Sequence, residues 1–244
     1  MVSVVGMAAG LFRRGERILR AGAGALVLLT ILLAAPAQAV VIDFETDSGG
    51  TPLVAGNGQD IDTEFAGFGI TLSTNNPLTN PLRLFNSNCL PGSCSGGDND
   101  LATGASFGTP AQGNILIINE TSGNTPDDNA GGGQIIFDFA RPTTLNEIGL
   151  VDNDNAPGIS LDVFKASSPA SPAFTLLFNA VAQENTFLSF VFGPEFADVV
   201  RLAVNLPGSG AIAFLDVTPV PLPASWLLFI SAVLAFGWFT RKRG

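Results

Sequence analysis

The sequence predicts an all-β fold for the central part of the chain, a two-sheet jelly-roll β-sandwich of about ten strands. Many short apolar runs are separated by Gly, Asn, Pro and Asp, and no helical period is sustained between them. Several runs alternate in the way expected of strands with one buried face, as Ile159, Leu161 and Val163 do with polar neighbours. The runs recur about every dozen residues with glycine-rich turns between them, which suits a sandwich better than a barrel or a solenoid.

In chain order, the expected strands cover residues 40–45, 69–73, 82–86, 114–119, 134–139, 145–151, 159–165, 174–179, 187–192, 199–205 and 211–217. Residues 86–113 contain no convincing strand, and a loop of that length in a compact domain usually has a function or is held by a local constraint.

Cys89 and Cys94 are the only cysteines, and in an exported protein we expect them to form a disulfide within this loop. So short a closed loop stabilises by at most ~2 kcal/mol, so the bond is expected to shape the loop locally. A redox-active pair is the alternative, but the spacing is not Cys-x-x-Cys and no neighbouring charge lowers a thiol pKa.

The first 39 residues have the pattern of a signal peptide. Four arginines precede an apolar run at 21–35, and Ala37 and Ala39 then provide the small residues that signal peptidase reads. A retained membrane helix is the alternative, but the apolar run of about 15 residues is short for one. We therefore expect an exported domain at 40–219, cleaved from its leader after Ala39.

The last segment, 220–244, has the pattern of a short membrane span followed by basic residues. Its apolar stretch of about 17 residues is at the lower limit for crossing a bilayer, and the basic end is expected to stay cytoplasmic. The ordered features are Val220, Pro221, Leu222, Pro223 and Ala224 before the span, and Arg241, Lys242 and Arg243 after it.

These features resemble the VPLPA-type PEP-CTERM sorting signal of Gram-negative bacteria. The resemblance implies a single-span sorting helix that enters the inner membrane transiently and is cut near the motif by exosortase. It also implies a protein secreted to the cell surface or extracellular matrix, in association with exopolysaccharide. A permanent single-span anchor is the alternative, and it predicts the same topology.

Charge and composition exclude several functions for the central domain. Twenty acidic residues against four basic ones give residues 40–220 a formal charge of −16. Nucleic-acid binding is therefore excluded as a function, because phosphate backbones are held mainly by Lys and Arg. The chain has no His, which excludes triads with a histidine base and histidine zinc sites.

The acidic residues are grouped with Asn and Gly in several turns, where carboxylate, amide and backbone oxygens together suit Ca²⁺. Ordinary acidic turns are the alternative reading of any single group. From these turns the candidate ligands are Asp98, Asp100, Asp127, Asp128, Asp152 and Asp154.

The segments 41–45 and 213–217, which open and close the domain, resemble those of the galactose-binding-like jelly rolls found in many carbohydrate-binding modules. The resemblance implies a structural calcium ion held near the first and last strands, and it makes Glu45 and Asp216 the best-placed ligands.

Three functions remain for the domain. The first is a non-catalytic surface or matrix protein stabilised by calcium. The second is a carbohydrate-binding module or lectin, in which Phe164, Phe190 or Phe192 would replace the usual Trp or Tyr as a stacking surface if exposed, although alternation places most such Phe residues in the core. The third is a glycoside hydrolase with two carboxylates ~5 to ~9.5 Å apart, although the sequence points to no such pair.

Overall fold

One long strand connects the two sheets of the sandwich. In the computed structural model, which describes residues 38–181 and 183–220, this strand is β5 (Gly133–Val151). Its first half pairs with β2 (Ile70–Thr74) and β9 (Val199–Leu206), and its second half with β8 (Phe187–Val191) and β10 (Ala211–Pro219). The pairing with β9 shifts register between Asp138 and Thr143, and Pro142 in this segment has no N–H to donate to a ladder. The strand changes sheets there.

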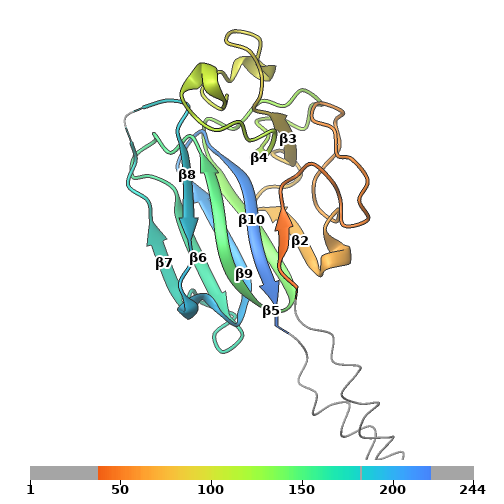
Figure 1. The fold of residues 1–244 in the computed structure, drawn as a ribbon, viewed down its shortest axis with the longest axis vertical. Coiled ribbons are helices and arrows are strands. Elements are labelled where there is room, and N and C mark those ends of the chain that lie inside the picture. The colour runs from red at the N-terminus through yellow and green to blue at the C-terminus, as the bar shows by residue number, and fades with distance from the viewer. Residues whose placement is uncertain (1–37, 182, 221–244) are drawn as a thin grey trace, which may run out of the picture. The chain divides into compact units, whose positions relative to one another are not determined.

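The two sheets consist of antiparallel pairs throughout the described residues (Figure 1). Sheet one has the order β2–β5–β9–β6–β7 and adds β6 (Ser160–Lys165) and β7 (Phe174–Leu177). Sheet two has the order β3–β4–β10–β5–β8 and adds β3 (Leu82–Asn86) and β4 (Asn114–Ile118); β1 (Val40–Ile42) also pairs with β10. The all-β prediction is therefore confirmed.

The strand boundaries differ from the predicted ones at two informative places. Residues 134–139 and 145–151 were expected as two strands because Arg141 and Pro142 interrupt the apolar pattern, but they belong to the single strand β5. The first strand ends at Ile42 rather than at residue 45, because Phe44 has a φ of 62°, outside the extended region.

The helical elements of the described residues are short 3-10 turns, namely η2 (Ala66–Phe68), η3 (Ser95–Gly97), η4 (Ala105–Phe107) and η5 (Pro194–Phe196). No helix among the described residues is long and apolar enough to span a membrane. Residues 1–37 of the predicted leader (1–39) and residues 221–244 of the predicted sorting segment (220–244) lie outside the described residues.

Two apolar cores stabilise the fold, one on each side of sheet two. Leu116 and Ile118 of β4 belong to the main core, whereas Ile115 and Ile117 belong to a second cluster. Because alternate residues of a strand face opposite sides, a strand buried on both faces is mostly apolar, and β4 is apolar after its first residue, Asn114. Each such side chain stabilises the fold by roughly 1.5–3 kcal/mol.

The segment 87–113 covers the second cluster and lies at the end of the sandwich away from the described termini, in yellow in Figure 1. It contains the disulfide between Cys89 and Cys94, whose Cα atoms are 5.1 Å apart. The side-chain amide of Asn185 donates hydrogen bonds to the carbonyls of Asn99, Asp100 and Ala102. The long loop is thus fastened to the residues that precede β8.

Candidate functional site

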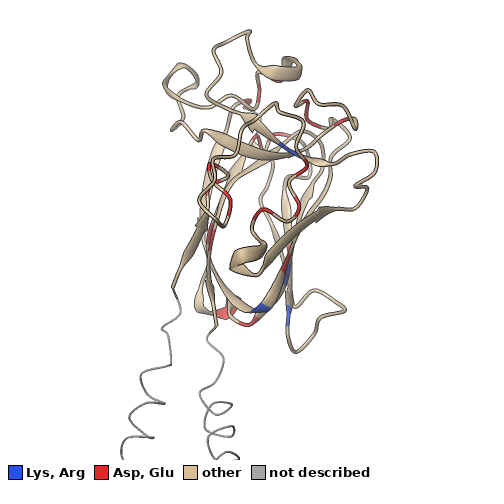
Figure 2. Cartoon of the chain, turned by 90° about the vertical axis from the view of Figure 1, so that its right-hand side faces the viewer, with Lys and Arg blue, Asp and Glu red and all other residues tan. Residues whose placement is uncertain are grey.

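Carboxylates greatly outnumber basic groups on the surface of the domain (Figure 2). Two ion pairs are formed among the described residues, Arg83 with Asp60 and Arg201 with Asp138, the latter at 2.7 Å. Lys165 lies over the ring of Phe174, 5.3 Å from its centroid. Most of the carboxylates in the described part of the chain therefore have no basic partner.

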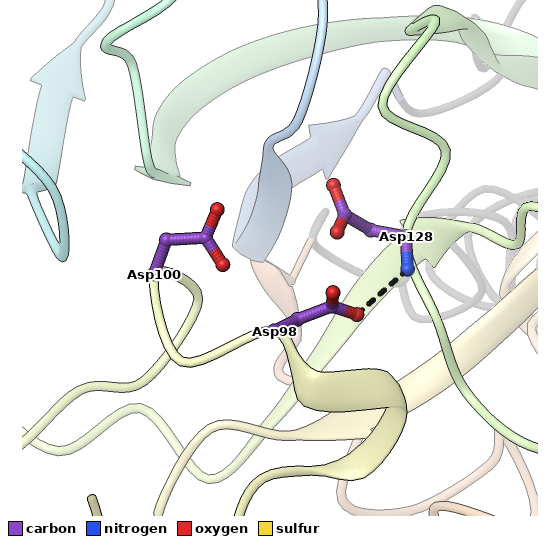
Figure 3. A group of neighbouring side chains, drawn as sticks. All are labelled: Asp98, Asp100 and Asp128. Atoms are coloured by element: carbon purple, nitrogen blue, oxygen red, sulfur yellow. Dashed lines mark hydrogen bonds between the residues drawn. The ribbon is translucent and has the colours of Figure 1, made fainter. Parts of the chain in front are cut away.

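Three of the predicted metal ligands, Asp98, Asp100 and Asp128, form what we call the aspartate cluster (Figure 3). One carboxylate oxygen from each lies within 4.8 Å of the others. Asp98 and Asp100 follow η3, whereas Asp128 lies between β4 and β5. The backbone N–H of Asp128 donates to Asp98 at 2.9 Å, and this bond joins the two segments.

Asp152 follows the last residue of β5 and lies beside the cluster. Its side chain is fully buried, with 0% of its surface exposed, and neither carboxylate oxygen accepts a hydrogen bond from the described residues. Asp152 and Asp128 both lie at Gly210, whose N–H donates to Asp128 at 3.3 Å and whose Cα faces the carbonyl of Asp152.

Burial dominates the electrostatics of this group. It raises the pKa of Asp152 to about 7, and the neighbouring charges of Asp154, Asp100 and Asp128 raise it further. Burial likewise raises the pKa of Asp98 to about 7, with Asp128, Asp127 and Asp100 adding to the effect. The pKa of Asp128 is also raised, first by burial. The ionised form of the group is therefore unfavourable in this protein environment unless a cation accompanies it.

The remaining predicted ligands flank the cluster or lie elsewhere. Asp127 lies against Gly96, and Asp154 accepts a hydrogen bond from the Asn155 amide at 2.7 Å.

Glu45 accepts the N–H of Asn114 at 2.8 Å and its side-chain amide at 3.3 Å, whereas Asp216 accepts the Asn146 amide at 3.0 Å. Within the described residues neither Glu45 nor Asp216 joins a close group of three acidic side chains. A calcium site shared by the two stays a prediction.

A second feature is a groove of about 300 Å³ on the outer face of sheet two, next to the second core, which we call the Phe214 groove. Val41, Asp216 and Glu147 are register partners across β1, β10 and β5, and this pairing places two carboxylates side by side. The lining residues are Val41, Asp43, Ala111, Gln112, Glu147, Ala213, Phe214 and Asp216.

The ring of Phe214 lies directly against the backbone of Gly149 on the neighbouring strand. A Cβ at position 149 would be 2.6 Å from the ring, so a larger residue there would displace it. Phe214 is not among the residues predicted from the sequence, because its pairing with Gly149 across β10 and β5 is not readable from either segment alone.

The three phenylalanines predicted as stacking surfaces do not line the Phe214 groove. Phe192 is buried in the main core, as alternation predicts for most of these residues, and it therefore offers no stacking surface. Phe190 packs edge-on against Phe178 and Phe192, each at 5.1 Å between centroids, because its strand faces the space between the sheets. Phe164 lies near the Arg201 guanidinium, 6.0 Å from its ring centroid.

No protein-family model and no curated protein matches the chain. Among solved structures it is similar to the F5/8 type C domain of a Bacteroides fragilis protein, with 16% identity, a TM-score of 0.27, and coverage of 37% of this chain and 68% of that one. It is also similar to a Streptococcus pneumoniae fucose-binding module, with 10% identity, a TM-score of 0.25, and coverage of 38% and 69%. A His 62 mutant of the lectin-binding domain of lectinolysin, complexed with Lewis b, gives 9% identity, a TM-score of 0.25, and coverage of 77% and 94%.

Proposed function

We propose that the chain is an exported, non-catalytic protein of the cell surface or extracellular matrix of a Gram-negative bacterium, and that its domain binds carbohydrate in the Phe214 groove. The observation that carries this proposal is a half-buried aromatic ring set among hydrogen-bond acceptors in one groove. The disulfide supports export, because such bonds persist mainly in oxidising compartments.

The groove has the two kinds of surface that a sugar ring needs. The apolar C–H face of a sugar packs against an aromatic ring, here Phe214, with Val41 and Ala213 extending the apolar lining. Ionised carboxylates accept hydrogen bonds from pairs of hydroxyl groups, and Glu147 and Asp216 are cross-strand neighbours. A domain of charge −16 repels acidic sugars, so the fitting ligands are neutral or amino sugars of an exopolysaccharide.

The sorting pathway belongs to the same proposal. Signal peptidase removes the leader after Ala39, and exosortase cuts near the motif that begins at Val220 while the tail crosses the inner membrane. The motif, the short span and the basic end of the sequence support this route.

Binding of neutral and amino oligosaccharides to the full chain, purified in mild detergent, tests the carbohydrate function. We expect Phe214→Ala to weaken binding about tenfold, because it removes both the stacking contact and its buried area. Phe164→Ala is the matched control, since this half-buried ring lies on the other sheet, and it should leave affinity unchanged. Affinity that is equal in the parent and in Phe214→Ala contradicts the assignment.

A further inference from the structure

We propose that Asp98, Asp100, Asp128 and Asp152 bind one calcium ion, which fastens the segment 87–113 to the ends of β5 and β10. This site is separate from the Phe214 groove and does not depend on the carbohydrate function.

The distances between carboxylate oxygens in the aspartate cluster match the spacing of ligands around one calcium ion. Calcium binds oxygen ligands at 2.3–2.6 Å, so two ligands on opposite sides of it lie about 5 Å apart. The carboxylate oxygens of Asp98, Asp100 and Asp128 are all within 4.8 Å of one another. Their carboxylates are grouped around a common space in Figure 3.

Asp152 is the independent observation that points to a ligand. The carboxylate of Asp152 is fully buried and its oxygens accept no hydrogen bond within the described residues, although the Ser209 hydroxyl is near enough to lower its pKa in part. Burying an ionised group with so little compensation costs several kcal/mol. Asp100 and Asp128 are close enough to act on its charge, and the turn at Ser209 and Gly210 contacts all three residues. A cation shared with the cluster would give this carboxylate the partner that it otherwise lacks.

When these aspartates are ionised, no basic side chain in the described part of the protein balances their charge. Asp152 lies next to the three carboxylates of the aspartate cluster, and none of the four forms an ion pair with a Lys or Arg within residues 38–181 and 183–220. The two ion-paired arginines, Arg83 and Arg201, neutralise Asp60 and Asp138 instead.

The ligand chemistry selects calcium among the common metals. Four carboxylates offer up to eight oxygens, which matches the six to eight that calcium takes. Zinc prefers nitrogen and sulfur ligands, but the chain has no His and its two cysteines are disulfide-bonded. Magnesium requires stricter octahedral geometry and retains its waters, which suits a site built mainly from loops less well.

An ion at this position would connect segments that are far apart in the sequence. Asp98 and Asp100 lie in the covering loop, Asp128 precedes β5, Asp152 follows β5, and Ser209 and Gly210 precede β10. Ala111 and Gln112 of the same loop form one wall of the Phe214 groove. Calcium would therefore also hold that wall in place.

The test uses the full chain in mild detergent, freed of divalent ions, with equilibrium dialysis to count bound calcium and far-ultraviolet circular dichroism to follow melting. At calcium about a hundredfold above Kd, we expect the melting temperature to rise by about 5 to 10 °C. Asp152→Asn should bind calcium at least about tenfold more weakly. Without calcium, Asp152→Asn should melt at or above the melting temperature of the parent, because the variant has no unpaired buried charge. With calcium, the parent should melt at the higher temperature.

Asp62→Asn is the matched control, because Asp62 is exposed and lies outside the cluster, and it should respond to calcium as the parent does. If Asp152→Asn does not fold, Asp100→Asn replaces it, since Asp100 is only half-buried and should show the same loss of binding. The proposal is overturned if the parent binds no calcium at millimolar concentration, if these variants bind it like the parent, or if magnesium stabilises equally.

Discussion

Single residues with several partners decide how the long loop is held. Asn185 has a φ of 59°, a conformation that asparagine tolerates better than most residues. This backbone presents its amide to three loop carbonyls. In a sequence, such an asparagine looks like any other turn residue, because its partners are more than eighty positions away.

At the same scale, the raised pKa values predict how the calcium-free domain responds to pH. Asp152 and Asp98 have folded-state pKa values of about 7, against an unfolded value of about 3.9. Between these values the folded state binds more protons than the unfolded state. The stability that this proton binding contributes is therefore fully present below about pH 4 and is lost as the pH rises through 7.

Urea unfolding of calcium-free protein at several pH values between 5 and 8 measures this effect by circular dichroism. We expect the free energy of unfolding to fall with pH in the parent and to fall less in Asp152→Asn. Asp62→Asn should keep the slope of the parent. Identical slopes in all three proteins would show that Asp152 is not a proton-binding group in this range.

At the scale of elements, local patterns and long-range pairing contribute differently. The alternation of apolar residues correctly predicts strand positions such as β6, because it depends on neighbouring residues only. The local pattern does not predict that β5 is one continuous strand. Its interruption at Arg141 and Pro142 is overcome by pairing with residues on β9 and β10, which the local pattern does not contain.

The covering loop gives a prediction at this scale. The double variant Cys89→Ser, Cys94→Ser should lose ~2 kcal/mol or less of unfolding free energy, because the disulfide closes a very short loop. Thermolysin should cut this loop faster in the variant, since it contains exposed Leu90. A much larger loss would mean that the disulfide supports the second core and not only the loop.

For the whole molecule, the sorting proposal predicts the mass of the mature protein. The exported chain should lack residues 1–39 and the segment after the proposed sorting motif, because the proposed processing site and the proposed sorting motif flank the domain. Intact mass spectrometry of protein from the native cell surface measures this. A mass that still includes Trp226 to Gly244 would contradict exosortase cleavage and leave a permanent anchor.

The sequence by itself determined the all-β class, the approximate strand positions, the strandless loop and the acidic character of the domain. These properties follow from interactions over a few residues: alternation of side chains, the restricted backbone of Pro and the freedom of Gly, and the count of charges. The candidate ligands Asp98, Asp100 and Asp128 were also readable, as acidic turns.

Only the tertiary structure decided which of these turns meet. It groups Asp98 and Asp100 with Asp128, places buried Asp152 beside them, and gives Glu45 and Asp216 separate amide partners. It also creates the Phe214 groove by setting Phe214 against Gly149. Such groupings depend on the register of strands far apart in the chain, and a slip of one residue would turn each side chain to the opposite face.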